Sequence, residues 1–157
     1  VDAAAFVACL CALPLRPGAA AQLHAGDLDK RARRLTIRHD KAGAGRTIPL
    51  PSEALELLSA QAAGKLPGAP LLTRADGRRW GKEAWGNAIT QAAAVAGLPR
   101  ATIAYNIRHS VIADLVNNGH PLMLVAQLSG TSVAMIERHY AKLDDAQAAT
   151  ALAGLAL

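Results

Sequence analysis

The stretch from Ala104 to Tyr140 constrains the fold most, because its helix-capping and helix-ending residues divide it into three short consecutive helices. Apolar residues recur at helical spacing over Asn106–Asn118, with Asn106 as the expected cap and Gly119 as a helix-ending residue. Pro121 begins a second helix that continues to about residue 128. A tight turn follows, and Ser132 caps a third helix that reaches the tyrosine. This stretch therefore predicts a mainly helical architecture.

The rest of the chain is also rich in helix-forming residues. More than half of the 157 residues are apolar, and much of this fraction is alanine. Only five residues are aromatic, namely Phe6, Trp80, Trp85, Tyr105 and Tyr140. Such a composition favours helices over sheets, and the length suffices for one domain with its own core. Further helices are expected at about 2–12, 19–23, 51–63, 82–96 and 144–157.

One hairpin interrupts the helices. Between Arg33 and Arg38 apolar and polar residues alternate, with Leu35 and Ile37 on one face, as in a half-buried strand. A glycine-rich turn at 40–45 carries Lys41 at its tip, and Arg46–Leu50 forms a second strand whose Pro49 indicates a sheet edge. Leu71–Thr73 is expected to be a third strand. We therefore predict an α+β fold, mainly α-helical, with a small antiparallel sheet of about three strands.

Charge and cysteine usage restrict the partners and the compartment. The formal net charge is +5 and the isoelectric point is about 9.7, which suits a polyanionic partner such as nucleic acid. Cys9 and Cys11 lie two residues apart on a predicted helix and point to different faces, so they are not expected to form a disulfide. No histidine cluster lies nearby to complete a zinc site. No apolar run is long enough to span a membrane.

Five short motifs occur in a characteristic order and spacing. They are Leu15-Arg16-Pro17-Gly18; Lys41 before Gly43 and Arg46-Thr47-Ile48-Pro49-Leu50; Tyr105-Asn106-Ile107-Arg108-His109; Leu128-Ser129-Gly130-Thr131-Ser132; and Tyr140. The acidic turn Asp27-Leu28-Asp29 follows the first motif. Together they resemble the catalytic domain of the tyrosine recombinases, the phage integrase family. The resemblance covers nearly the whole chain. It implies that residues 1–157 form this catalytic domain and that an upstream DNA-clamping domain lies outside this chain.

The resemblance implies site-specific recombination or integration of DNA through a 3′-phosphotyrosyl intermediate. Tyr140 would be the nucleophile, Arg16 and Arg108 would stabilise the charge on the phosphate, and Lys41 would protonate the leaving 5′-oxygen. No metal or other cofactor is implied. His109, beside Arg108, is a candidate for orienting the site. The other histidines are expected at the surface.

Three positions depart from the family pattern. Tyr105 and Thr131 stand where the family has histidines, and Ala19 stands where it has a glutamate. Neither a tyrosine nor a threonine is a good proton acceptor near neutral pH. Loss of a positioned acid or base slows a reaction by about 10²–10⁴. We therefore include Tyr105 and Thr131 among the site residues and expect slow catalysis.

The resemblance also implies partners and a location. Double-stranded DNA would be the substrate, the protein would assemble as a tetramer on it, and the last helix could pack on a neighbour or on its own domain. A cytoplasmic, nucleoid-associated protein of a bacterium or phage is expected, with no membrane partner.

Three other readings remain open at this point. A degenerate relative would bind DNA without cutting it, as the changes at Tyr105, Thr131 and Ala19 suggest. A type IB topoisomerase would use a similar set of arginines, lysine and tyrosine. A helical protein of another class, such as a transcriptional regulator, would leave the motif residues scattered in space.

Overall fold

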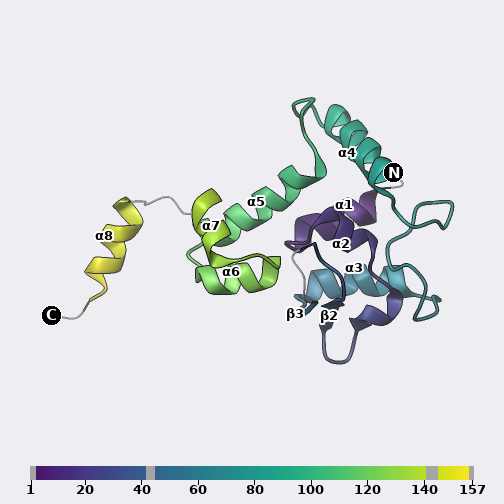
Figure 1. The fold of residues 1–157 in the computed structure, drawn as a ribbon, viewed down its shortest axis with the longest axis horizontal. Coiled ribbons are helices and arrows are strands. Elements are labelled where there is room, and N and C mark those ends of the chain that lie inside the picture. The colour runs from purple at the N-terminus through teal and green to yellow at the C-terminus, as the bar shows by residue number, and fades with distance from the viewer. Residues whose placement is uncertain (1–2, 42–44, 141–144, 156–157) are drawn as a thin grey trace.

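The computed structural model describes residues 3–41, 45–140 and 145–155. Its helices are α1 (Ala4–Ala12), α2 (Pro17–Ala21), α3 (Ser52–Ala62), α4 (Lys82–Val95), α5 (Ala104–Asn117), α6 (Leu122–Ser129), α7 (Val133–His139) and α8 (Asp145–Ala153), drawn in Figure 1. They confirm the helices predicted from periodicity. The predicted glycine-rich turn lies partly outside the described residues, at positions 42–44.

A three-stranded antiparallel sheet has the order β1-β2-β3. The strands are β1 (Leu28–Asp29), β2 (Arg34–Ile37) and β3 (Arg46–Pro49), and a 3₁₀ turn (Ala25–Asp27) precedes β1. Leu35 pairs with Ile48 in the register, and Leu35, Ile37 and Ile48 are buried, as the alternating pattern predicts. Pro49 lies on an edge strand, where a residue without a backbone N–H is tolerated. The fold is therefore the predicted α+β arrangement.

The prediction for the third strand was wrong. Leu71 and Leu72 are both buried, whereas a strand packed on one face would bury only every second residue. Leu71 donates a backbone hydrogen bond to Leu23, and Thr73 forms only an isolated bridge with Arg79. The actual third strand is β1, whose two residues are too few for a detectable alternation.

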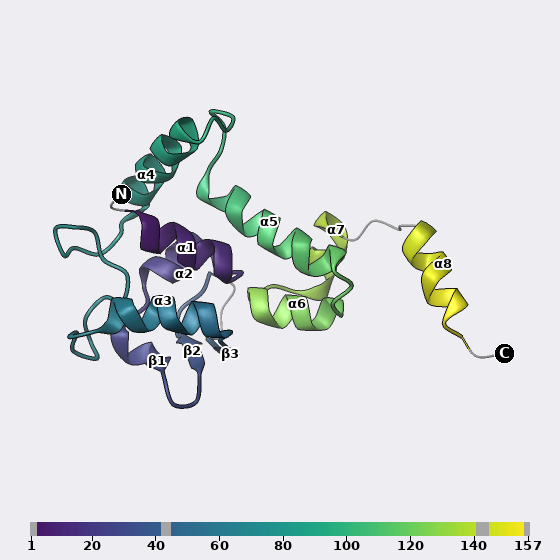
Figure 2. The same ribbon diagram turned by 180° about the vertical axis from the view of Figure 1, so that it is seen from behind.

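The main hydrophobic core is built around α1. Phe6 and Leu10 of α1 are almost fully buried, and the aromatic rings of Phe6 and Trp80 lie with centroids 5.3 Å apart. Leu35 from the sheet and Leu58 from α3 belong to the same cluster. Seen from behind in Figure 2, α1 and α2 lie close to α3 and the sheet.

A second, smaller core joins α5, α6 and α7. Its fully buried members are Ile112, Val125, Ala126 and Ile136, from all three helices. The start of α5 belongs to the main core instead, through Ala104. Helix α5 therefore connects the two cores, and residues in its first half lie at the seam between them.

The start of α5 corrects one predicted cap. The helix begins at Ala104, and Asn106 lies inside its first turn. The backbone N–H of Ile103 donates to the Asn106 side chain at 2.6 Å, so Asn106 reaches back over the helix start. The predicted cap at Ser132 is confirmed, because its hydroxyl accepts from the Met135 N–H at 3.2 Å.

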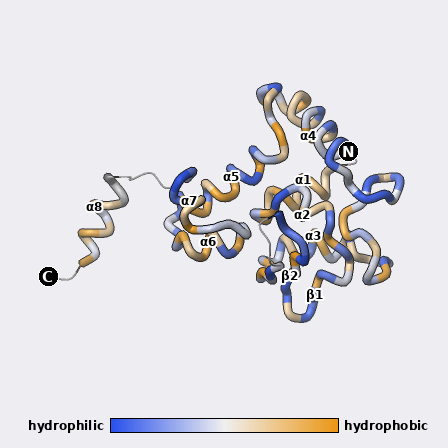
Figure 3. The backbone as a smooth tube through the Cα atoms, in the orientation of Figure 1, coloured by the Kyte–Doolittle hydropathy of each residue, from blue (hydrophilic) through white to orange (hydrophobic). Residues whose placement is uncertain are grey.

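Helix α8 stands apart from the other elements in both ribbon views (Figures 1 and 2). It carries apolar residues, as the orange segments of Figure 3 show, and Leu152 is 68% exposed. No helix in the described ranges has both the length and the hydropathy to cross a membrane.

Candidate active site

Arg16 is positioned by the start of α2. Its backbone is extended, and Pro17 occupies the first helical position, where its missing N–H costs nothing. The Arg16 Nη1 donates to Asp40 Oδ1 at 2.6 Å and to the Gly130 carbonyl at 2.9 Å. These two bonds use both hydrogens of Nη1, and no other described residue bonds to the Nε–Nη2 edge of the guanidinium, which can bind a ligand. This edge has the fork geometry that binds two oxygens of one phosphate.

Asp40 is the centre of an ionic cluster that links the hairpin to the helices. Its side chain is only 2% exposed, and its second oxygen accepts from Arg46 Nη1 at 2.5 Å. Arg46 Nε also donates to the Leu128 carbonyl near the end of α6, at 3.1 Å. Burial opposes the charge of Asp40, but hydrogen bonds from Arg46 and Arg16 lower its pKa below the usual value. Asp40 therefore stays ionised between two arginines.

Gly130 leaves the space that this cluster needs. It follows α6 in the left-handed conformation, with φ of 65°. A Cβ atom there would lie 2.2 Å from Arg46 Nη1 and 2.9 Å from Asp40 Oδ2. Both the backbone conformation and the neighbouring side chains therefore require glycine.

Replacing Gly130 with alanine is expected to destabilise the protein by more than the cost of placing an L-residue in the left-handed conformation. A left-handed L-residue costs about 1–2 kcal/mol, and the clash with Arg46 adds to it. Gly119→Ala is the matched control, because Gly119 has φ of 79° with no atom near the added Cβ. In urea unfolding, Gly130→Ala should lose more free energy of unfolding than Gly119→Ala. Equal losses would contradict the tight packing around Arg46.

Arg108 is a buried residue that also lines the candidate site. It is 5% exposed, because α5 carries it into the seam between the two cores. Its Nη1 donates to the Pro14 carbonyl and its Nη2 to the Ser129 carbonyl at 2.8 Å. Burial and the charge of Arg16 lower the pKa of Arg108 to about 10, so it remains a cation at neutral pH.

Tyr140 lies at the C-terminal end of α7, with its hydroxyl in hydrogen-bond contact with His109 Nδ1. The ring centroids of these two residues are 5.7 Å apart. Burial raises the pKa of Tyr140, and the positive charge of Arg108 acts in the opposite direction. A group that accepts the proton is therefore needed if the hydroxyl is to act as a nucleophile near neutral pH.

Two pockets contain all six predicted site residues. A pocket of about 230 Å³ is lined by Arg16, Tyr105, Arg108, His109, Ile112, Thr131, Met135, Ile136, His139 and Tyr140. A second, of about 300 Å³, is lined by Arg16, Gly18, Ala19, Gln22, His39, Asp40, Lys41 and Tyr105. Because Arg16 and Tyr105 line both, the pockets adjoin. The residues are thus gathered, which argues against the reading in which the motifs match by accident.

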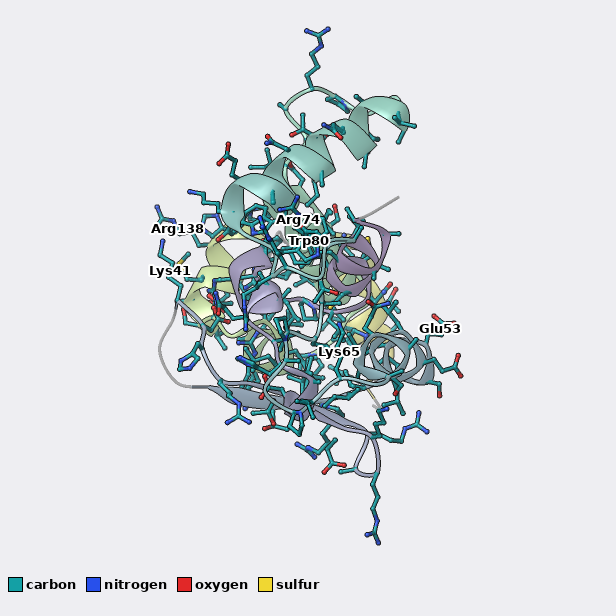
Figure 4. All side chains as sticks on the ribbon, turned by 90° about the vertical axis from the view of Figure 1, so that its right-hand side faces the viewer. Lys41, Glu53, Lys65, Arg74, Trp80 and Arg138 are labelled. Atoms are coloured by element: carbon teal, nitrogen blue, oxygen red, sulfur yellow. The ribbon has the colours of Figure 1, made fainter. Side chains whose placement is uncertain are left out.

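Lys41 and Tyr140 line different pockets, and Arg16 lines both of them. Lys41 lines only the second pocket and Tyr140 only the first. Lys41 is exposed, and Figure 4 shows it projecting from the same side of the molecule as Arg138 of α7. Glu53 of α3 lies on the opposite side in that view. The face beside the site therefore presents cations.

Two residues of this site, Asp40 and Arg46, were not predicted from the sequence. Asp40 and Arg46 were assigned only to a turn and a strand, and no local pattern indicates that they meet Arg16. His109 was named as an orienting residue, but its contact with Tyr140 joins segments 31 positions apart. His39 and His139, expected at the surface, are exposed yet line the pockets. Among the described residues no cluster of three or more metal-ligating side chains occurs.

Several solved structures have a similar fold. The Tn1549 transposon integrase, in complex with transposon right end DNA, matches with a TM-score of 0.83 and 17% identity, over 96% of this chain and 58% of that one. The XerA recombinase matches with a TM-score of 0.77 and 18% identity, over 99% and 59% of the two chains. The catalytic domain of bacteriophage HP1 integrase matches with a TM-score of 0.65 and 22% identity, over 99% of this chain and 86% of that one.

The solved chains of the first two of these relatives are longer than the chain described here. The chain spans about three fifths of their length, so it corresponds to a part of them. At these identities the likeness is one of fold. No match to a curated protein sequence was found. The sequence profile of the Phage integrase family, however, matches residues 1–147, nearly the whole chain. The chain belongs to the phage integrase family.

Proposed function

We propose that this protein is a DNA strand transferase of the tyrosine recombinase type, which cuts and rejoins DNA through a 3′-phosphotyrosyl intermediate. The observation that carries the proposal is the position of the Tyr140 hydroxyl. It contacts a histidine in a pocket that two arginines also line, Arg16 and Arg108. This pocket supplies a nucleophile, a proton acceptor and positive charge in one place.

The arginines would stabilise the negative charge that develops on the phosphate. Arg16 offers its Nε–Nη2 edge, to which no described residue bonds, and Arg108 adds a cation that is held by two backbone carbonyls. Both guanidinium groups are fixed before any ligand arrives, so little reorganisation is needed during the reaction. With these charges beside it, a phosphodiester bound at Arg16 would lie within reach of Tyr140.

The two adjoining pockets, both lined by Arg16, would hold the groups that an in-line displacement needs. The Tyr140 oxygen would form a bond to phosphorus as the bond to the 5′-oxygen breaks on the other side. Lys41 lines the second pocket, beside Arg16, and would donate a proton to the leaving oxygen. The free 5′-hydroxyl could later attack the phosphotyrosine of another strand and release Tyr140.

His109 would take the proton that Tyr140 loses. The tyrosine hydroxyl would donate to its Nδ1. His109 would thus perform the proton transfer that Tyr105 and Thr131 cannot. Both of these residues line the same pocket and would contribute hydrogen bonds to phosphate oxygens. The reaction therefore does not require a histidine at either position.

Several observations support DNA as the substrate. The net charge is +5, and Lys41 and Arg138 project on the same side of the molecule (Figure 4). The similar Tn1549 integrase structure holds transposon DNA. An upstream DNA-clamping domain, assembly as a tetramer on two duplexes and a cytoplasmic location in a bacterium or phage are parts of the same proposal.

Covalent trapping on a mixed substrate tests this function without knowledge of the target site. A pool of labelled duplexes with randomised sequence would carry a nick, so that the short cleaved end diffuses away. On a denaturing gel we expect an adduct for the natural protein and none for Tyr140→Phe, which lacks the nucleophilic oxygen. An equal adduct with both proteins would contradict the proposal.

The same substrates separate the related activities. DNA retained on the folded protein without any adduct would indicate a relative that binds DNA but does not cut it. Once a reactive duplex has been selected, transfer of its strand to a second duplex would support recombination. Relaxation of a supercoiled plasmid without such transfer would indicate a topoisomerase.

A further inference from the structure

The cluster of Asp40, Arg16 and Arg46 connects three parts of the chain that are distant in sequence. Asp40 belongs to the hairpin just before Lys41, Arg16 precedes α2, and Arg46 begins β3. Each oxygen of the buried Asp40 carboxylate accepts from a different arginine. Through Arg46 the cluster also reaches the Leu128 carbonyl, and through Arg16 the Gly130 carbonyl. One carboxylate thus ties the hairpin to the end of α6.

We propose that Asp40, held from behind by Arg46, is the positioning residue that turns the Nε–Nη2 edge of Arg16 toward the bound phosphate. This inference rests on the proposed function of Arg16. Asp40 itself would not touch the substrate, because both of its oxygens are already occupied by the arginines. Its effect on the reaction would pass through Arg16.

The geometry explains why a carboxylate is needed. A long arginine side chain has many rotamers, and Arg16 would lose its fixed direction without a partner for Nη1. The Gly130 carbonyl supplies one acceptor and Asp40 the other, so Nη1 is held from two directions. The opposite edge of the guanidinium, Nε–Nη2, is then the one left to bind a phosphate. A neutral acceptor at position 40 could satisfy just one of the two arginines.

The charges support the same role. The positive charges of Arg16 and Arg46 lie close enough to Arg108 to lower its pKa. In the described part of the chain, Asp40 is the carboxylate that forms ion pairs with Arg16 and Arg46. It offsets their mutual repulsion and also favours the charged form of Arg108. The cluster keeps a net positive charge, so it can still attract a phosphate.

The position of Asp40 gives the contact a second consequence. Lys41, the proposed proton donor, is the next residue along the chain. Fixing the Asp40 side chain against Arg16 therefore also fixes the base of the segment that carries Lys41. The phosphate-binding arginine and the proton donor would keep a constant relative position through one buried ion pair.

Asp40→Asn is the most direct variant. The amide can turn its oxygen toward only one arginine, and its NH₂ group then faces the donor of the other. Arg46→Lys is a second variant, which keeps the positive charge but cannot donate to both Asp40 and Leu128 in the same geometry. Asp76→Asn is the matched control, because Asp76 pairs with Arg74 and Arg78 away from the pockets of the site. Urea unfolding would verify that each protein is folded.

Rates of adduct formation would be compared on two substrates selected from the random pool. One has an ordinary phosphodiester at the cleavage point, and the other has an uncharged methylphosphonate there. On the phosphodiester we expect Asp40→Asn to be slower by about 100-fold, as for a misplaced catalytic group. Asp76→Asn should match the natural protein. On the methylphosphonate, which needs less help from Arg16, the deficits of Asp40→Asn and Arg16→Ala should both shrink.

A deficit of the same size on both substrates would mean that Asp40 acts only through folding, which would overturn the proposal. An unchanged rate in folded Asp40→Asn would also overturn it. Arg46→Lys should resemble a milder Asp40→Asn, with the same dependence on the substrate charge. If Arg46→Lys forms the adduct more slowly by the same factor on both substrates, Arg46 does not have the role proposed for it.

A binding measurement keeps this test independent of catalysis. In ¹⁵N-labelled protein, the Arg16 Nε–H signal would be assigned by its absence in Arg16→Lys and followed while inorganic phosphate is added. We expect the signal to shift in the natural protein and to respond much more weakly in Asp40→Asn. An equal response would refute the positioning role. If no adduct forms with the natural protein but this difference is seen, the strand-transfer proposal fails and the positioning of Arg16 stands.

Discussion

Replacing Arg108 with alanine is expected to lower the free energy of unfolding by roughly 3 kcal/mol and to abolish strand cleavage. The Pro14 and Ser129 carbonyls would lose their donor in a buried place, and each such loss costs about 1–3 kcal/mol. Arg108 also lies where the main core meets the core of α5, α6 and α7. Its removal should therefore weaken the connection between them.

Urea unfolding of Arg108→Ala, Arg108→Lys and Arg138→Ala would measure this effect. Lysine keeps the charge, but a single ammonium group lacks the planar fork that reaches both carbonyls. For Arg108→Lys we therefore expect a free energy of unfolding between those of Arg108→Ala and the natural protein, and slow cleavage. Arg138 is an exposed arginine on α7, and its removal should change the unfolding free energy by no more than about 0.5 kcal/mol. If Arg108→Ala unfolds at the same urea concentration as the natural protein, the role of Arg108 as a structural clamp is wrong.

Replacing His109 is expected to slow adduct formation by about 10²–10⁴, the usual effect of removing a positioned proton acceptor. His109→Asn is the sharpest variant, because the asparagine amide can occupy the place of Nδ1, the atom that contacts Tyr140. It keeps a hydrogen-bond acceptor but cannot take up the proton. His109→Phe removes both properties. If His109→Asn is fully active and His109→Phe is not, the histidine only positions the tyrosine.

The deficit of His109→Asn should depend on pH. Burial raises the pKa of Tyr140, so without an internal acceptor its proton must pass to water or hydroxide. More phenolate forms as the pH rises toward this elevated pKa, and the rate of the variant should increase with it. The difference between His109→Asn and the natural protein is therefore expected to narrow at alkaline pH.

His139→Asn provides the control for this experiment. His139 lines the same pocket, with its ring centroid 6.3 Å from that of Tyr140, but the hydroxyl of Tyr140 contacts His109. Its replacement should leave the shape of the pH profile unchanged. A pH profile of His139→Asn like that expected for His109→Asn would show that the proton acceptor was wrongly assigned.

Local patterns in the sequence predicted most of the fold. The alternation at Leu35 and Ile37 and the cap at Ser132 depend on residues close together in the chain, and each has the predicted structure. Most helix ends follow from the same short-range signals, although α5 begins at Ala104 and not at the predicted cap Asn106. The third strand failed because a two-residue strand and a buried loop leave no periodicity, so Leu71–Thr73 was chosen instead of Leu28–Asp29.

The contents of the site were predictable only through the family resemblance. Its order and spacing singled out Arg16, Arg108 and Tyr140, which the structure brings to one pocket. The burial of Arg108 was not predictable, since it depends on a carbonyl 94 positions away. Asp40 and Arg46 were missed for the same reason. An acid in a turn and an arginine on a strand have ordinary surface roles, and only tertiary contacts reveal their cluster.

The most direct test of the central claim is to identify the amino acid that carries the DNA. The adduct from the random pool would be digested with nuclease and protease, and the modified peptide sequenced by mass spectrometry. We predict a nucleotide attached through its 3′-phosphate to the Tyr140 oxygen. Attachment to Tyr105, the other tyrosine of the site, or to any serine or to His109, would contradict the account.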